Sequence, residues 1–107
     1  MASLAILDEA AEEVVAAAEY IEEEREGYGR LFLNEYGDKL TQVARFPQSG
    51  ARLQRRVAGL ELRAFSLKRF PYTVVVAVQE GRSVIIAVAH MSREPGYWRD
   101  RLDETSS

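Results

Sequence analysis

Hydrophobic side chains in the first third of the chain recur at the spacing of an α-helix and predict two helices. The first should run from Asp8 to about Glu26, with Asp8 as its N-cap. The two glycines of Gly27–Gly29 then interrupt the pattern, and a second helix should run from about Arg30 to Ala44. Because the intervening turn is short, the two helices should pack as an antiparallel hairpin. Their apolar stripes are Ala10, Val14, Ala18 and Ile21 in the first and Phe32, Tyr36, Leu40 and Val43 in the second.

After a loop at residues 46–50, which contains Pro47 and Gly50, the pattern changes to that of β-strands. Glu80-Gly81 separates two β-branched, apolar runs and predicts a tight hairpin between them. The expected strands are Leu60–Lys68, Tyr72–Gln79 and Ser83–Ala89, with Leu4–Ile6 as a short edge strand.

The two strands of that hairpin carry apolar side chains at successive positions, so both faces of the sheet must be covered. The helical hairpin can cover only one face. Either a partner protein or the C-terminal segment around Tyr97-Trp98 has to cover the other.

Composition excludes several classes of protein. The 107 residues, 47% of them hydrophobic, suffice for a single domain with one core, ending in a polar tail at residues 103–107. The chain has no cysteine and one histidine, His90, so we expect no disulfide, no metal site, no cofactor and no cysteine nucleophile. No apolar run is long enough to span a membrane and no secretory signal is visible, so we expect a cytoplasmic protein.

The net charge of −3 conceals a strong asymmetry. Residues 1–44 carry 11 acidic and three basic side chains, whereas residues 45–101 carry 11 basic and four acidic ones. All the basic residues of the second part except Lys68 are arginines. Such a distribution presents a cationic surface to a partner, or it is simply the solvated surface of the strands.

The segment after the last strand holds the side chains best suited to binding. The strand should end at His90 and deliver Arg93, and Pro95-Gly96 should turn the chain and set Tyr97 and Trp98 beside it. This group could bind a phosphate backbone, with bases stacked on the aromatic rings. Alternatively, the two aromatic side chains cover the open sheet face and His90 is an ordinary strand-end residue.

The order and spacing of these elements resemble the toxins of the RelE/ParE superfamily of bacterial type II toxin–antitoxin systems over nearly the whole chain. The residues that carry the resemblance are Glu12, Glu13, Tyr20, Ile21, Gly27-Tyr28-Gly29, Phe32, Pro47, Gly50, Arg63, Phe70-Pro71-Tyr72, Ala87-Val88-Ala89-His90, Arg93, Pro95-Gly96-Tyr97-Trp98 and Arg101.

The resemblance implies an α+β fold in which an N-terminal antiparallel helical hairpin packs on one face of a small, mainly antiparallel β-sheet. It also implies a cognate antitoxin, whose disordered C-terminal region folds onto the toxin and covers exposed apolar surface. Operator DNA would be bound only through that antitoxin.

The superfamily divides in mechanism, and three hypotheses follow from the resemblance. The first is a ParE-like toxin that has no catalytic site and inhibits DNA gyrase. The second is a RelE-like, ribosome-dependent mRNA endoribonuclease; in such members an arginine is typical near the start of the strand where this chain has Thr73. The third is a degenerate member retained mainly as an antitoxin partner and transcriptional co-repressor. The target-binding residues of the first hypothesis are Arg63, His90, Arg93, Tyr97 and Arg101, and the catalytic residues of the second are Arg63, Lys68, Arg69, His90, Arg93 and Tyr97.

Overall fold

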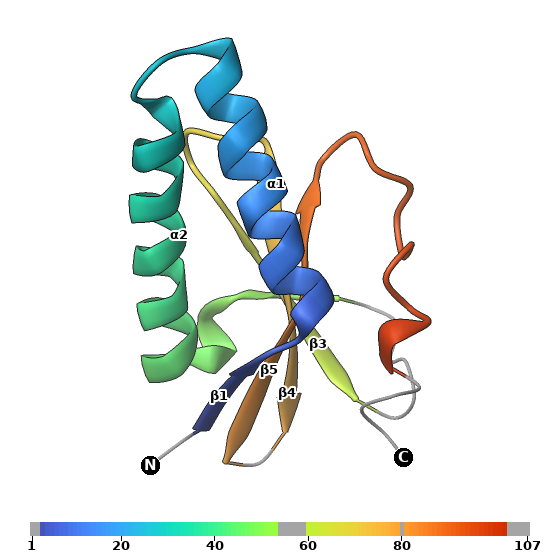
Figure 1. Ribbon diagram of the computed structural model, residues 1–107. Helices are drawn as coiled ribbons and strands as arrows, with labels where there is room; N and C mark the ends of the chain where they lie inside the picture. Colours follow the sequence, from blue (N-terminus) through green and yellow to red (C-terminus); the bar gives the residue numbers. More distant parts are fainter. Residues whose placement is uncertain (1–2, 54–59, 80, 103–107) are drawn as a thin grey trace.

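The computed structural model describes residues 3–53, 60–79 and 81–102 (Figure 1). The polar tail at residues 103–107 and Glu80 of the predicted hairpin turn lie outside the described residues. The division of the chain into one domain stays a prediction.

Two α-helices form the predicted hairpin: α1 spans Asp8–Glu24 and α2 spans Tyr28–Arg45. The prediction of Asp8 as N-cap is wrong, because Leu7 is the N-cap and Asp8 is already in the first turn. The backbone of Leu7 serves two elements, since its N–H donates to the carbonyl of Ile85 and its own carbonyl accepts from Ala11 at the start of α1. The helix therefore begins where the preceding strand ends, without a polar cap.

The turn between the helices contains only one of the two glycines that were predicted to lie in it. Gly27 has a φ of 87°, a left-handed conformation that glycine adopts without strain, whereas Tyr28 and Gly29 already belong to α2. The carboxylate of Glu22 on α1 accepts hydrogen bonds from the N–H groups of Gly27 and Gly29, at 2.9 and 3.0 Å. An acid at the positive end of a helix dipole stabilises that end, so α1 itself caps α2.

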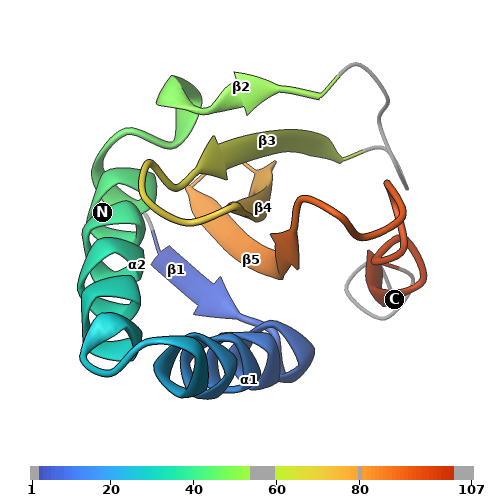
Figure 2. The ribbon, with the colours of Figure 1, turned by 90° about the horizontal axis from the view of Figure 1, so that it is seen from above.

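The five strands are β1 (Ser3–Ile6), β2 (Ala51–Arg52), β3 (Glu61–Ser66), β4 (Tyr72–Gln79) and β5 (Arg82–His90), and a short 3-10 helix (Pro47–Ser49) precedes β2. They form one sheet in the order β1-β5-β4-β3-β2. All neighbours are antiparallel except β1 and β5, which are parallel. Figure 2, which looks down on the molecule, shows α1 and α2 together on one side of this sheet. The predicted α+β fold is confirmed, and only the two-residue β2 was missed.

The pairing of β4 with β5 contains an irregularity that changes which side chains of β5 face the two cores. Val75 pairs with Ala87 and Val76 pairs with Ile85, so Ile86 is an extra residue on β5. A bulge of this kind shifts the alternation of side chains by one position. As a result, the successive residues Ile86 and Ala87 both belong to the core on the side away from the helices.

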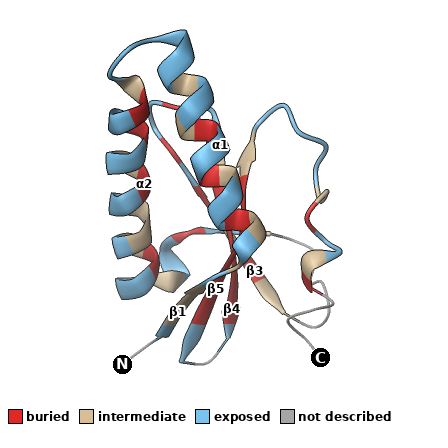
Figure 3. Ribbon diagram, in the orientation of Figure 1, coloured by how far each residue is buried: buried red, intermediate tan, exposed pale blue. Residues whose placement is uncertain are grey.

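Two hydrophobic clusters cover the two faces of the sheet, as the uninterrupted apolar strands predicted. In Figure 3 the buried residues are concentrated on the central strands β4 and β5 and recur along both helices. The face toward the helices is covered by the stripes of α1 and α2, including the fully buried Ala10, Phe32 and Val43. On the opposite face, Trp98 and Leu102 of the C-terminal segment are buried with residues of β3, β4 and β5. Of the two alternatives for covering the second face, the C-terminal segment is therefore the one that the structure shows. This face as a whole is not left open for a partner protein.

Candidate functional site

The end of β5 places His90 opposite Tyr72, the first residue of β4. The two rings meet edge to face, with centroids 5.0 Å apart. The Nδ1 atom of His90 lies 3.0 Å from the backbone nitrogen of Ser92 and 2.7 Å from its Oγ. Because a backbone N–H can only donate, this geometry makes Nδ1 an acceptor and leaves the proton of the neutral ring on Nε2.

Arg93 follows in the turn after β5, and its N–H donates to the carbonyl of His90 at 3.0 Å. Its guanidinium carbon lies 3.8 Å from the centre of the Tyr97 ring, a cation–π contact. Gly96, with a φ of 79°, completes the predicted turn that brings the ring back to this position. In the described part of the chain no carboxylate pairs with Arg93.

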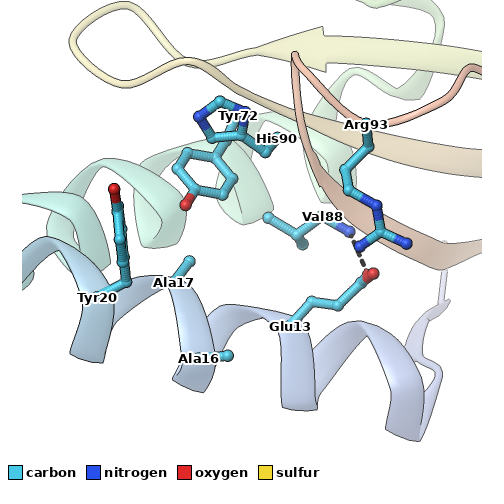
Figure 4. A pocket seen from close by; sticks show the side chains of 8 residues that line it. All are labelled: Glu13, Ala16, Ala17, Tyr20, Tyr72, Val88, His90 and Arg93. Atoms are coloured by element: carbon cyan, nitrogen blue, oxygen red, sulfur yellow. Dashed lines mark hydrogen bonds between the residues drawn. The ribbon is translucent and has the colours of Figure 1, made fainter.

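A cleft of about 200 Å³ lies between α1 and the end of β5 (Figure 4). Tyr72, His90 and Arg93 line it from the sheet side, and Ala16 and Ala17 of α1 form part of the opposite wall. Such a volume is below that of most small-molecule sites, so the cleft fits a single side chain or anionic group better than a whole metabolite. The complete lining is Glu13, Ala16, Ala17, Tyr20, Tyr72, Val88, His90 and Arg93.

Glu13 of α1 is the most heavily bonded side chain at the cleft. Its carboxylate accepts from the N–H of Val88 at 3.0 Å and from the hydroxyl of Tyr97 at 2.5 Å. Two guanidinium nitrogens of Arg101 donate to its two oxygens at 2.9 and 3.0 Å, the bidentate geometry that makes the strongest ion pairs. We call Glu13, Val88, Tyr97 and Arg101 the Glu13 network.

The network shifts the pKa of each of its three titratable members. Burial alone would raise the pKa of Glu13, but the hydrogen bonds from Arg101, Tyr97 and Val88 outweigh burial and lower it. Burial, together with the hydrogen bond to the Glu13 carboxylate and its charge, raises the pKa of Tyr97 to about 12. The hydrogen bond to Glu13 likewise raises the pKa of Arg101. All three shifts favour an ionised Glu13 and a neutral Tyr97 around neutral pH.

We therefore predict an acid-sensitive component of stability that depends on Glu13. A carboxyl group whose pKa is lower in the folded than in the unfolded chain stabilises the fold at pH values above its ordinary pKa, which is 4.5 for Glu13. This contribution to stability is lost as the pH falls through the pKa of the group in the folded chain. Urea unfolding measured between pH 7 and pH 3 should show this decline in the native chain, and Glu13→Gln should remove it. The prediction fails if both proteins lose stability by the same amount over this range.

Two other predicted target-binding cations, Arg63 and Arg101, are engaged in contacts within the protein. Arg63 of β3 donates to the carbonyls of Gln48 and Gly50 at 3.2 and 3.0 Å and to the side-chain oxygen of Gln48 at 2.6 Å. Its guanidinium thus holds the segment before β2 against the sheet. Arg101 is engaged with Glu13 and with the carbonyl of Ile86, at 3.1 Å.

Lys68 and Arg69 lie in the connection between β3 and β4, where their backbone N–H groups donate to the carboxylate of Glu35 on α2. They line a different hollow, next to Leu31 and Asp38 of α2. From the sequence-based set, the structure therefore brings together His90, Arg93, Tyr97 and Arg101. It holds Arg63, Lys68 and Arg69 apart from them.

Glu13 carried the family resemblance but was not among the predicted site residues. A signal was present in the sequence, because Glu13 follows Ala10 by three positions and precedes Ala17 by four. Those spacings put a charged side chain on the apolar face of α1, where it needs a partner. The partners themselves are 75 to 88 residues away, and no local pattern identifies them.

Within residues 3–53, 60–79 and 81–102, no three histidine or acidic side chains are grouped so that they could hold a metal ion. Over the same residues, neither α-helix has the length and apolar character needed to cross a membrane.

Comparison with known proteins gives a family and a structural relative. Residues 4–95 match the family described as the ParE toxin of the type II toxin–antitoxin system, parDE. Among curated proteins, none matches the sequence significantly. A solved chain from the chromosomal ParDE toxin–antitoxin system of P. aeruginosa has the same fold, with a TM-score of 0.68 at 18% identity, covering 84% of this chain and 96% of that one. The family model spans most of the chain, including both helices and every strand that borders the cleft; the chain therefore belongs to the ParE toxin family and is the toxin component of a type II toxin–antitoxin system, with a cognate antitoxin as its partner.

Proposed function

We propose that this toxin inhibits DNA gyrase and that His90 and Arg93, at the mouth of the cleft, contact the target. Gyrase inhibition is the known activity of ParE toxins, and the toxin would exert it in the cytoplasm. The surface needs no catalytic group for this role, since a binding protein inhibits by occupying or trapping its target. Repression of an operator would follow only through DNA binding by the antitoxin.

The dispersal of the basic side chains is the observation that carries this proposal. Phosphoryl transfer depends on cations that are positioned together around the reacting phosphate, and loss of one costs orders of magnitude in rate. Here Arg63 and Arg101 are committed to contacts within the protein, and Lys68 and Arg69 line a separate hollow. Thr73, at the position where nucleases of the superfamily carry an arginine, pairs its hydroxyl with that of Ser66 at 3.3 Å. These contacts favour the gyrase inhibitor over the endoribonuclease.

The antitoxin should cover apolar surface that the fold itself leaves exposed. Val15 and Tyr20 of α1 are 57% and 58% exposed, and Leu33 of α2 is 46% exposed. Contiguous exposed apolar surface is typical of a protein-binding site, and Ala11, Val15 and Ala16 line one hollow on α1. Because α1 also presents Glu12 and Glu19 beside Val15, an antitoxin segment with both apolar and basic residues would complement it.

Two assays on the same purified protein distinguish gyrase inhibition from cleavage of mRNA. The toxin should inhibit supercoiling of relaxed plasmid by gyrase, or trap a cleaved gyrase–DNA complex, and it should leave ribosome-bound mRNA intact. The physical reason is that one free arginine and one histidine can bind a target, but they lack the other cations that stabilise a phosphoryl-transfer transition state.

Addition of the cognate antitoxin should restore supercoiling, which serves as the control for specific inhibition. Codon-positioned cuts in ribosome-bound mRNA that disappear in Arg93→Ala would instead establish the endoribonuclease.

A further inference from the structure

The edge of β5 becomes unpaired where β1 ends, and side chains take over its hydrogen bonds. β1 pairs with β5 only from Arg82 to Ile85. Beyond that point, the carbonyl of Ile86 accepts from Arg101 and the N–H of Val88 donates to Glu13. Backbone groups at a sheet edge need partners, and here an ion pair between α1 and the C-terminal segment supplies them.

The same ion pair fixes the ring on which Arg93 rests. The hydroxyl of Tyr97 donates to Glu13, and the guanidinium of Arg93 lies 3.8 Å from the centre of the Tyr97 ring. The guanidinium carbon of Arg101 lies 5.2 Å from the same ring centre. Figure 4 shows Glu13 and Arg93 at the same end of the cleft, reaching into it from α1 and from the segment after β5.

We propose that Glu13 is a positioning residue, which sets the direction of the Arg93 guanidinium through the hydroxyl and ring of Tyr97. Tyr97 and Arg101 then serve as its supports rather than as target contacts. Because Arg101 already neutralises Glu13, the acid holds the ring in place without forming an ion pair with Arg93. Arg93 keeps its charge and hydrogen-bonding groups for the partner, in an orientation fixed before binding. This role rests on the proposed contact between Arg93 and the target.

Two substitutions test the positioning role, and one further substitution on α1 controls for loss of charge. Glu13→Gln cannot accept from Tyr97, Val88 and two nitrogens of Arg101 together, whereas Tyr97→Phe keeps the ring but loses the hydroxyl. Glu23→Gln removes the same charge from the same helix, at an exposed position without a hydrogen bond or ion pair to the residues described. Each variant is compared with the native toxin after its folded fraction has been measured by circular dichroism.

Per folded molecule, Glu13→Gln and Tyr97→Phe should each need about three- to tenfold more toxin for half-maximal gyrase inhibition, the loss that follows when one long side chain must be ordered on binding. The Tyr97 ring, 3.8 Å from the Arg93 guanidinium carbon, should shift the Arg93 side-chain NMR signals of the native protein. In both variants these signals should move toward the values of an unstructured arginine. Glu23→Gln should change neither quantity.

A purely structural role would lower the stability of Glu13→Gln but leave activity per folded molecule unchanged, and this outcome would overturn the proposal. If Glu13→Gln does not fold, Tyr97→Phe decides the question, because this variant retains the ion pair between Glu13 and Arg101. Native activity together with native Arg93 signals in Tyr97→Phe would also overturn the proposal. If native toxin leaves gyrase uninhibited, the proposed function fails by itself, and induced growth inhibition at equal soluble protein level provides the activity measurement instead.

Discussion

Replacing Arg93 with alanine should abolish growth inhibition while leaving the fold almost unchanged. Arg93 is exposed, forms no ion pair with the described residues, and has the Tyr97 ring as its side-chain contact. Loss of an exposed cation–π contact costs no more than about 1 kcal/mol of stability. Loss of a charged group that contacts the target removes both the attraction and the geometry of that contact, so the effect on toxicity should be much larger than the effect on folding.

The measurement is growth after induction in cells without the antitoxin, paired with the melting temperature of the purified variant. Arg82→Ala is the matched control, because it removes an exposed arginine at the start of β5, the strand whose other end leads to Arg93. Arg82→Ala should remain toxic. An Arg93→Ala protein that is stable and still fully toxic would remove this side chain from the target contact.

Truncating Trp98 should have the largest effect on stability. Its side chain is 8% exposed and is buried with Leu62, Val75 and Ile86 against the face of the sheet that the helices do not cover. Deletion of a buried aromatic side chain typically costs roughly 3–5 kcal/mol, because apolar contacts are lost and a cavity remains. For a domain of this size, much of the total stability would be removed.

Urea unfolding of Trp98→Ala and the native chain, followed by far-ultraviolet circular dichroism, measures this loss. Met91→Ala is the control, since Met91 is 59% exposed and its truncation should change stability by less than about 0.5 kcal/mol. Toxicity of Trp98→Ala should fall only in proportion to its folded fraction. A stability close to that of the native chain would mean that the C-terminal segment does not cover this face in solution.

The elements of the fold follow from local patterns, whereas their ends depend on tertiary contacts. Tyr72–Gln79 was predicted with the bounds that the structure gives, because a short apolar, β-branched run between two turns is typical of a buried β-strand. The N-cap was predicted one residue too late, at Asp8 instead of Leu7, since the sequence alone does not show that Leu7 is held by β5. The break around Gly27 was predicted, but its width was not, because Glu22 caps the N-terminus of α2 from the preceding helix.

The candidate site shows a similar division. The strand end at His90, the turn at Pro95-Gly96 and the return of Tyr97 toward Arg93 could all be predicted from neighbouring residues. The sequence could not predict whether each charged side chain is free or bonded to other groups of the protein. Arg63 and Arg93 are the same residue type on or beside the same sheet, yet one holds a loop and the other lies at a cleft.

By itself, the sequence determined the helical hairpin, the apolar strands with two faces to cover and the family to which the toxin belongs. The hairpin and the strands arise from periodicity and turn residues, which act over short stretches of chain. The family follows from the order and spacing of these elements along nearly the whole chain. Only the tertiary structure decided that the C-terminal segment covers the second face and that Glu13 joins α1, β5 and that segment. The contacts of Glu13 join residues more than 70 positions apart. Both sets of contacts depend on the sheet register, the bulge at Ile86 and the point where β1 ends.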